Sequence, residues 1–227
     1  MVSTLQSKVF AYNGELIVTI FCMDYTTLAS SESVERAAHA LTANRFIPIK
    51  LGSGAEALEY IKTHIPKGAS VMNGSSVTLE EIGFVDYLKA GQHGWNNLHA
   101  NVLAEQDAGK RADLRRYSVV SDYYLGSVHA LSETGEMVIA SNTGSQLPHL
   151  VYTSPNLILV VSTKKITPTL AAAIERLEKH VVPLEDEHMK KLYGSGTTRN
   201  KTLILHGESA MMKRSATVLL VKENLGF

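Results

Sequence analysis

Hydrophobic and polar residues along the first half of the chain follow two repeating patterns. Helices with one buried face are expected where apolar residues recur every three or four positions. These segments are 34–41, with Ser31 as the expected cap, 58–65 and, with weaker patterns, 96–105 and 108–117. Strands are expected at 47–51, where apolar and polar residues alternate, and at 70–72, a short apolar run.

Strands dominate the second half of the chain. The apolar segments 128–131 and 137–140 flank Glu133-Thr134-Gly135, which predicts a hairpin or a tight corner between two strands. The continuous apolar run 157–161 is typical of a strand buried on both faces.

One more helix is expected before the last strands. Thr167-Pro168 places a capping residue before a proline at the first helical position, and Pro183 is expected to end this helix. A short helix to Tyr193 and strands at 202–205 and 217–221 follow. The alternation of helices and strands indicates an α/β sandwich with a mixed sheet.

The first 22 residues are set apart from this pattern. Asn13-Gly14 stands between the apolar segments 9–12 and 15–21, which is a strong signal for a hairpin. Met23 could itself be a translation start, so residues 1–22 are either an added hairpin or the result of a wrongly assigned gene start. We assign residues 23–227 to one domain.

The composition narrows the possible functions. The 22 Lys and Arg residues balance 22 Asp and Glu residues, so the chain as a whole has no attraction for nucleic acid or anionic membranes. No apolar run reaches the ~18 residues of a membrane helix, and no signal peptide is recognised, so a cytoplasmic protein is expected. The single cysteine, Cys22, excludes an internal disulfide and an iron–sulfur cluster held by this chain.

Six phrases in order along the chain resemble the LUD domain of the lactate-utilisation B and C proteins. They are MDYTTLAS (23–30), GSSVTLEEIGF (74–84), ETGE (133–136), ASNTGSQLP (140–148), KITPTL (165–170) and VKENLGF (221–227). The resemblance covers residues 23–227. It implies a three-layer α/β/α sandwich similar to ribose-5-phosphate isomerase, glucosamine-6-phosphate deaminase and coenzyme A transferases. It also implies a link to L-lactate oxidation beside iron–sulfur partner subunits.

A turn between a strand and a helix is the first candidate site. The turn is Asn73-Gly74-Ser75-Ser76, and Thr78 with Glu81 reads as a capping box for a helix that runs to Lys89. Exposed N–H groups and the hydroxyls of Ser75, Ser76 and Thr78 could bind a phosphate or carboxylate. The alternative is a turn that only caps its helix.

Three further features complete the candidate site. Glu133, beside Thr134 and Gly135, is the candidate general base, or else a solvated hairpin tip. A polar loop could bind a small ligand or be an ordinary turn; its candidate residues are Ser141, Asn142, Gly144, Ser145 and Gln146. Lys165 could supply positive charge to an acidic substrate, or lie exposed before a helix.

Two other patterns are weaker. The segment 52–57 fits the dinucleotide fingerprint G-x-G-x-x-A, but Asn73 stands where the acidic ribose ligand is expected, so a simple helix start is favoured. The nine histidines include no H-E-x-x-H motif, so we expect no metal and no cofactor.

The leading hypothesis is therefore a LUD-domain protein of lactate or small-carboxylate utilisation that binds a small anionic metabolite. One alternative is an isomerase or acyl-transferase acting on a sugar phosphate or coenzyme A ester. Another is a non-enzymatic subunit that binds an iron–sulfur partner protein or a second copy of itself.

Overall fold

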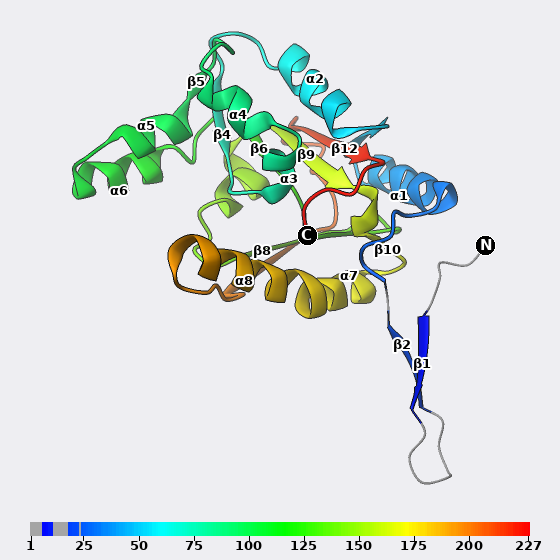
Figure 1. Cartoon of the computed structure of the whole chain (residues 1–227). Helices are drawn as coiled ribbons and strands as arrows, with labels where there is room; N and C mark the ends of the chain where they lie inside the picture. Colours follow the sequence, from blue (N-terminus) through cyan, green and yellow to red (C-terminus); the bar gives the residue numbers. More distant parts are fainter. Residues whose placement is uncertain (1–5, 11–17, 23) are drawn as a thin grey trace.

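The computed structural model describes residues 6–10, 18–22 and 24–227. Strands β1 (Gln6–Phe10) and β2 (Val18–Cys22) form a separate antiparallel pair that projects from the rest of the molecule (Figure 1). The pairing confirms that two strands meet here. The Asn13-Gly14 turn that was expected to join them lies outside the described residues.

Six parallel strands form the central sheet. Their spatial order is β3 (Ile47–Leu51), β12 (Ser215–Val221), β9 (Asn156–Ser162), β6 (Tyr123–Gly126), β4 (Ser70–Asn73) and β5 (Asn96–Asn97). Strand β9 is buried on both faces, as its apolar run predicted: Leu157 and Leu159 enter one core, whereas Ile158 and Val160 enter the other. All six carboxyl ends therefore lie along the same edge of the sheet.

Helices cover both faces of this sheet (Figure 1). On one face, apolar residues of α2 (Gly54–His64), α3 (Val77–Glu81) and α4 (Phe84–Lys89) pack into a common core. On the other face lies α1 (Ser31–Ala43), whose buried stripe is Ala37, Ala38 and Leu41. The expected three-layer α/β/α sandwich is confirmed.

A second, smaller sheet lies on the α1 side. Its order is β10 (Ile166–Thr167), β7 (Ala130–Ser132), β8 (Met137–Ser141) and β11 (Lys201–Leu205). Strands β7 and β8 are antiparallel, which confirms the hairpin predicted around residues 133–135. One face of this sheet joins the core beneath α1, and the other packs against the helical segments α7 (Leu170–Arg176) and η3 (Leu177–Val181).

The remaining helical segments lie at the periphery or at strand ends. They are α5 (Leu98–Ala104) and α6 (Ala108–Tyr117), which form a projecting arm, α8 (Val182–Tyr193), and the short turns η1 (His149–Thr153) and η2 (Thr163–Lys165) (Figure 1). The positions of α5 and α6 agree with the predicted segments within two residues.

The predicted helix caps were displaced by one or two residues. Ser30 rather than Ser31 caps α1, and Thr169 rather than the Thr167-Pro168 pair caps α7. In each case the cap hydroxyl accepts a hydrogen bond from the N–H three residues later, at 3.2 Å. Thr167 could not serve as the cap because its backbone belongs to β10, paired with Ser132.

Two helix boundaries were also predicted wrongly, and the strands β5, β6 and β10 were not predicted. The helix expected to run to Lys89 is divided at Gly83, where φ is 79°. Pro183 does not end a helix but lies in the first turn of α8, where its missing N–H is tolerated. Strand β6 was not predicted because Tyr123–Gly126 is short and directly follows polar segments.

Replacing Gly83 by alanine is expected to destabilise the protein by about 1–2 kcal/mol, because its left-handed backbone is unfavourable for any residue with a Cβ. The new methyl group itself has room, with Leu58 Cδ2 at 3.7 Å. Urea denaturation would measure the change. Gly109→Ala in α6 is the control; a loss of stability equal to that of Gly83→Ala would contradict the backbone explanation.

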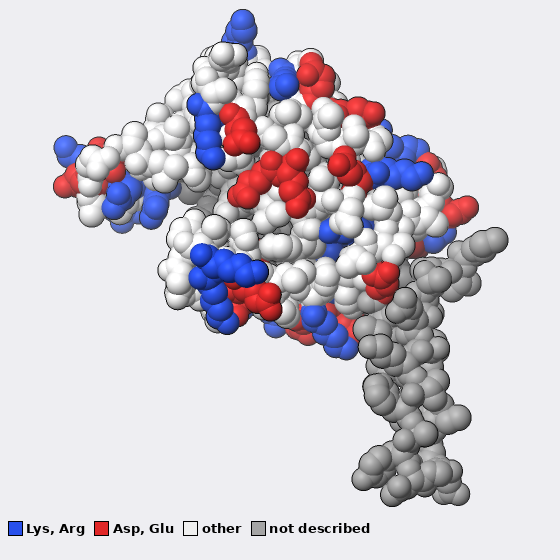
Figure 2. All heavy atoms as spheres, in the orientation of Figure 1, with Lys and Arg blue, Asp and Glu red and all other residues white. Residues whose placement is uncertain are grey.

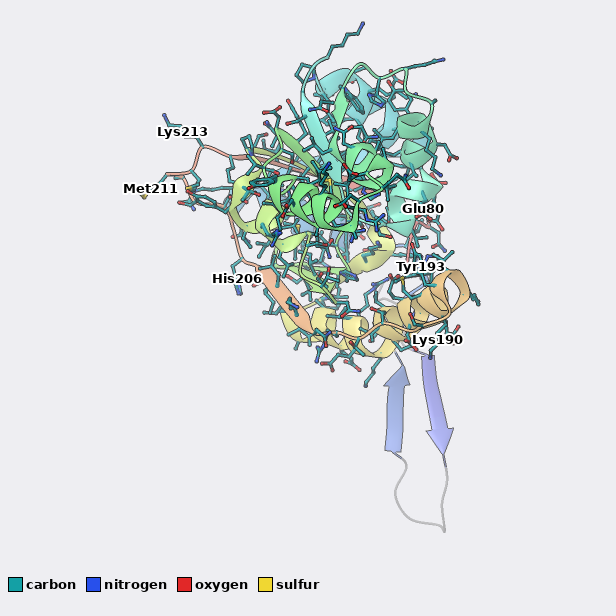
Figure 3. The ribbon with its side chains drawn as sticks, turned by 90° about the vertical axis from the view of Figure 1, so that its left-hand side faces the viewer. Glu80, Lys190, Tyr193, His206, Met211 and Lys213 are labelled. Carbon is teal, nitrogen blue, oxygen red and sulfur yellow. The ribbon has the colours of Figure 1, made fainter. Side chains whose placement is uncertain are left out.

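The visible surface carries charges of both signs without an extended basic area (Figure 2). The loop between β11 and β12 projects from the body of the molecule and carries Met211, which is exposed (Figure 3). Among the described residues, no helix combines the length and the apolar character needed to cross a membrane.

Candidate functional site

The strand order reverses between β4 and β6. The chain leaves β4 for β5 on one side, whereas β6 leads to β9 and β12 on the other. In open parallel sheets, ligands bind at the carboxyl ends of the strands that flank such a reversal. The ends of β4, β6 and β9 are therefore the first place to look for a site.

Three side chains from these strand ends meet at one point. Lys165 follows β9, Ser127 follows β6, and Thr78 lies in the first turn of α3 after β4. The Lys165 Nζ donates to Thr78 Oγ1 at 2.9 Å and to Ser127 Oγ at 3.0 Å. One ammonium group thus joins Lys165 to side chains that lie 87 and 38 positions before it in the sequence.

Lys165 is a buried cation with spare hydrogen-bonding capacity. Its side chain is almost fully buried, with 4% of the residue exposed. Burial, followed by the nearby positive charges of Arg176 and Lys164, lowers the pKa of Lys165 to about 7. An ammonium group has three donors, and the two hydroxyls take two of them. Within the described part of the chain no carboxylate hydrogen-bonds to this group.

Arg176 adds a second buried positive charge. It is 0% exposed, and its Nη1 donates to the carbonyl oxygen of His129. Its Nε and Nη2 have no hydrogen-bond partner among the described residues. Because burial disfavours the charged form, the pKa of Arg176 is lowered to about 10. The charge of Glu81 acts on Lys165, and the Tyr25 ring lies 5.9 Å from the Arg176 guanidinium, but among the described residues no carboxylate hydrogen-bonds to either cation, which favours an anion nearby.

The C-terminal segment 222–227 lies over this cluster. Lys164 Nζ donates to Asn224 Oδ1 at 2.6 Å and to the Gly226 carbonyl at 2.5 Å. A Cβ on Gly226 would lie 2.9 Å from Lys165 Nζ and closer still to Thr78 Oγ1. Glycine is therefore needed at position 226 for the backbone to approach the pair this closely.

The predicted turn lies beside this cluster, but its capping residue was predicted wrongly. Ser76, not Thr78, caps α3 by accepting from the Leu79 N–H at 3.3 Å. This leaves the Thr78 hydroxyl free to meet Lys165. Ser75 is exposed, and the buried Asn73 donates through Nδ2 to the Gly74 carbonyl at 3.1 Å.

The predicted loop reaches the turn through one residue. Gln146 Oε1 accepts from the Tyr124 hydroxyl at 3.3 Å, and a Cβ on Gly74 would lie 2.6 Å from that hydroxyl. The other loop residues bond within the loop or to its neighbours: Ser141 Oγ accepts from the Gly144 N–H, Ser145 Oγ accepts from Thr143, and Asn142 Oδ1 accepts from Asn200. Burial raises the pKa of Tyr124, which keeps this phenol protonated.

Glu133 does not face the turn. Its carboxylate accepts from Ser33 Oγ at 2.6 Å and from Arg36 Nε and Nη2 at 2.5 and 2.9 Å. The bonds from Arg36 lower the pKa of Glu133, which weakens it as a base. Gly135 is buried, with a φ of 93°, and the Thr134 hydroxyl donates to Glu136. Local contacts therefore fix the conformation of the turn between β7 and β8. The arrangement disfavours the general-base role given to Glu133.

The glycine-containing segment 52–57 is filled by acidic side chains of the chain itself. Ser53 caps α2, Glu56 accepts from the Gly52 N–H at 2.8 Å, and Glu223 accepts from the Gly54 N–H at 2.7 Å. The N–H groups that a dinucleotide would need are therefore already bonded. This agrees with the simple helix start favoured from the sequence.

Ser127 and Arg176 were missed by the sequence reasoning. Ser127 follows the unpredicted strand β6, so it could not be recognised as a strand-end residue. Arg176 lies outside the apolar stripe expected for this helix, which includes Ile174 and Leu177, so the pattern gave no sign that it is buried. Among the described residues, no group of three His, Cys, Asp or Glu side chains is placed to hold a metal ion.

Fold and site together define a parallel α/β sandwich with a buried cationic centre at the strand ends. The family model of the LUD domain matches residues 34–221, and the chain belongs to this family. A crystal structure of a DUF162 family protein from Deinococcus radiodurans is similar at 12% identity, over 86% of this chain and 98% of that one, with a TM-score of 0.47. No curated protein matches the chain.

Proposed function

We propose that the protein binds a small anionic metabolite at the ends of β4, β6 and β9, with Lys165 as its counter-ion. The observation that carries the proposal is the buried Lys165 ammonium, whose hydrogen-bond partners among the described residues are two hydroxyls, and which lies near a second buried cation. A structural ion pair would place a carboxylate there. Here the charge of Glu81 opposes the fall in the pKa of Lys165 only in part, so the ammonium group still favours an added anion.

The chemistry of the neighbours fits a small carboxylate or phosphate. Lys165 can supply its third N–H, and the Thr78 hydroxyl can donate its own proton while its oxygen accepts from Lys165. Because Gly226 covers this pair, a ligand reaches it when the C-terminal segment shifts, or from the side of the 73–76 turn. The close approach of Gly226 to both side chains favours a metabolite of a few carbon atoms.

The family points to the class of metabolite. We propose L-lactate or a related small carboxylate, because of the family's link to L-lactate oxidation. An iron–sulfur partner protein would then carry the electrons, since the single cysteine of this chain cannot hold a cluster.

Thermal unfolding with L-lactate, inorganic phosphate, ribose 5-phosphate and acetyl-coenzyme A tests the proposal. An anion present at several hundred times its dissociation constant should stabilise the protein by roughly 3–4 kcal/mol. Thr78→Val and Ser127→Ala should reduce this stabilisation, whereas Thr202→Val, an exposed threonine of β11, should not. Failure of all four anions to stabilise the well-folded parent would refute the proposal. A response only to ribose 5-phosphate or the thioester would replace the small-carboxylate assignment.

Anion binding should weaken as the pH rises above about 7. The protonated Lys165 is the form that attracts an anion, and its pKa in the free protein is about 7. The dissociation constant is expected to be constant between pH 5.5 and 6.5 and to rise by up to about tenfold per pH unit above 7. Isothermal titration calorimetry would measure both the constant and the proton uptake. A dissociation constant unchanged from pH 6 to 8.5 would exclude Lys165 as the titrating group.

A further inference from the structure

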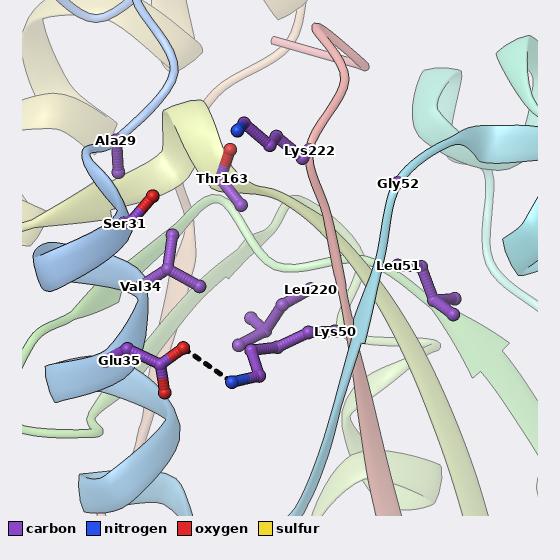
Figure 4. A pocket seen from close by; sticks show the side chains of 10 residues that line it. All are labelled: Ala29, Ser31, Val34, Glu35, Lys50, Leu51, Gly52, Thr163, Leu220 and Lys222. Atoms are coloured by element: carbon purple, nitrogen blue, oxygen red, sulfur yellow. Dashed lines mark hydrogen bonds and ion pairs between the residues drawn. The ribbon is translucent and has the colours of Figure 1, made fainter.

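A separate cavity of about 310 Å³ lies between α1 and the carboxyl ends of β3 and β12 (Figure 4). Its middle is apolar, lined by Val34 and Leu220, and its lower end carries the Glu35–Lys50 pair (Figure 4). Its upper end carries polar groups: the side chains of Ser31, Thr163 and Lys222 lie there in Figure 4. Ligand pockets commonly span about 300–1,000 Å³, so this cavity suits a small ligand and is too small for a nucleotide.

Thr163 points to a ligand at this place. The residue is 1% exposed, and its Oγ1 has no hydrogen-bond partner among the described residues. Leaving a buried hydroxyl without a partner costs about 1–3 kcal/mol. In Figure 4 its methyl group points into the cavity, whereas its oxygen lies on the side of the Lys222 amino group, where a ligand atom could accept its proton.

The charge at the polar end is positive. Lys50 Nζ pairs with Glu35 Oε1 at 2.5 Å, so these two lining residues neutralise each other. Lys222 forms no ion pair with any described residue, and its amino group lies at the same end of the cavity as the Thr163 hydroxyl (Figure 4).

We infer that this cavity binds a short aliphatic carboxylic acid as its anion. The carboxylate accepts from the Thr163 hydroxyl and pairs with Lys222, while the hydrocarbon chain packs on Val34 and Leu220. The polar upper end and the apolar middle of the cavity match the carboxylate and the hydrocarbon chain of such a molecule. No covalent step is involved.

This site is independent of the one proposed around Lys165. Thr163 and Lys165 are two residues apart, but the Lys165 ammonium bonds to Thr78 and Ser127, which do not line this cavity. Binding here therefore requires neither Lys165 nor movement of Gly226. One site can fail experimentally while the other holds.

Methyl NMR with hexanoate and hexan-1-ol as probes tests the inference on the full chain. Hexanoate is expected to shift the methyl resonances of Val34 and Leu220 in a saturable manner, and the uncharged alcohol to bind at least tenfold more weakly. Lys222→Met and Thr163→Val should each raise the dissociation constant about fivefold or more. Lys191→Met, on an exposed lysine of α8, should leave it unchanged.

Three outcomes would overturn the inference. The first is the absence of saturable shifts at Val34 and Leu220. The second is equally tight binding of hexan-1-ol, which would mean that the cavity binds apolar chains without selecting for a carboxylate. The third is a dissociation constant that Lys222→Met and Thr163→Val leave unaltered, or that Lys165→Met abolishes, since the acid would then occupy the other site.

Discussion

Replacing Lys165 by methionine is expected to stabilise the protein at pH 6 by about 2–3 kcal/mol and to abolish its response to small anions. The folded-state pKa of Lys165 is about 7, against an ordinary value of 10.5. Each pKa unit corresponds to about 1.4 kcal/mol, so holding the buried lysine protonated costs roughly 5 kcal/mol. Methionine has a similar length and no charge, but it leaves the Thr78 and Ser127 hydroxyls without their donor, at about 1 kcal/mol each.

The pH dependence of this gain has a definite sign. Below pH 7 the lysine is protonated in both the folded and the unfolded state, and the penalty is complete. As the pH rises from 7 to 10.5, only the unfolded state keeps the proton, so the penalty disappears and the parent approaches the variant.

Urea denaturation at pH 6 and pH 9.5 measures both effects. Lys191→Met is the control, because that lysine is exposed on α8. A Lys165→Met variant that is less stable at pH 6 and still stabilised by anions would mean that Lys165 serves only the packing of the strand ends.

Acid is expected to destabilise the protein by about 3 kcal/mol through His149 alone as the pH falls from 6.5 to 4. His149 is 1% exposed, its Nδ1 lies 2.8 Å from Ser154 Oγ, and its ring stacks on Tyr124 with centroids 4.6 Å apart. Burial lowers its pKa from 6.5 to about 4. The unfolded chain therefore binds a proton first, and the stability present above pH 6.5 is lost down to pH 4.

Measurement of unfolding free energies between pH 7.5 and 4 checks this slope. His149→Gln should be less stable at pH 7.5, because it loses the stacked ring, but should lose about 1.4 kcal/mol less per pH unit below 6.5. Burial also lowers the pKa of His129 and of His180, which adds slope of the same sign to both proteins. Parallel curves for parent and variant would show that His149 titrates normally.

Most of the fold could be predicted from local patterns, because burial imposes them. The apolar run of β9 is continuous since both of its faces enter a core, and the stripe of α1 repeats since one face does. The errors fall where tertiary contacts decide between neighbouring residues. Ser30 and Ser31 are equally good caps by sequence, and only the path of the backbone selects Ser30.

The candidate site could be predicted only in pieces. Thr78 and Lys165 were recognised as candidates, but the sequence offers no means of seeing that they touch. Ser127 was not recognised as a strand-end residue because strand β6, which it follows, was not predicted. Glu133 stood out in a family phrase and at a strand corner, yet its carboxylate bonds to α1, a partner that no local pattern indicates. Side chains brought together by parallel strands come from segments far apart in the chain, so their meeting depends on strand order.

Four consecutive residues at the end of β9 supply side chains to the two proposed sites and to the C-terminal segment between them. Ser162 bonds to the Glu223 carbonyl, Thr163 lines the cavity, Lys164 holds the C-terminal segment, and Lys165 meets Thr78 and Ser127. Gaining or losing one residue here would shift every side chain to the wrong neighbour. The length of this segment is therefore expected to be conserved within the family. Substitutions at position 165 should be accompanied by changes at positions 78 and 127. Position 163 should vary together with position 222.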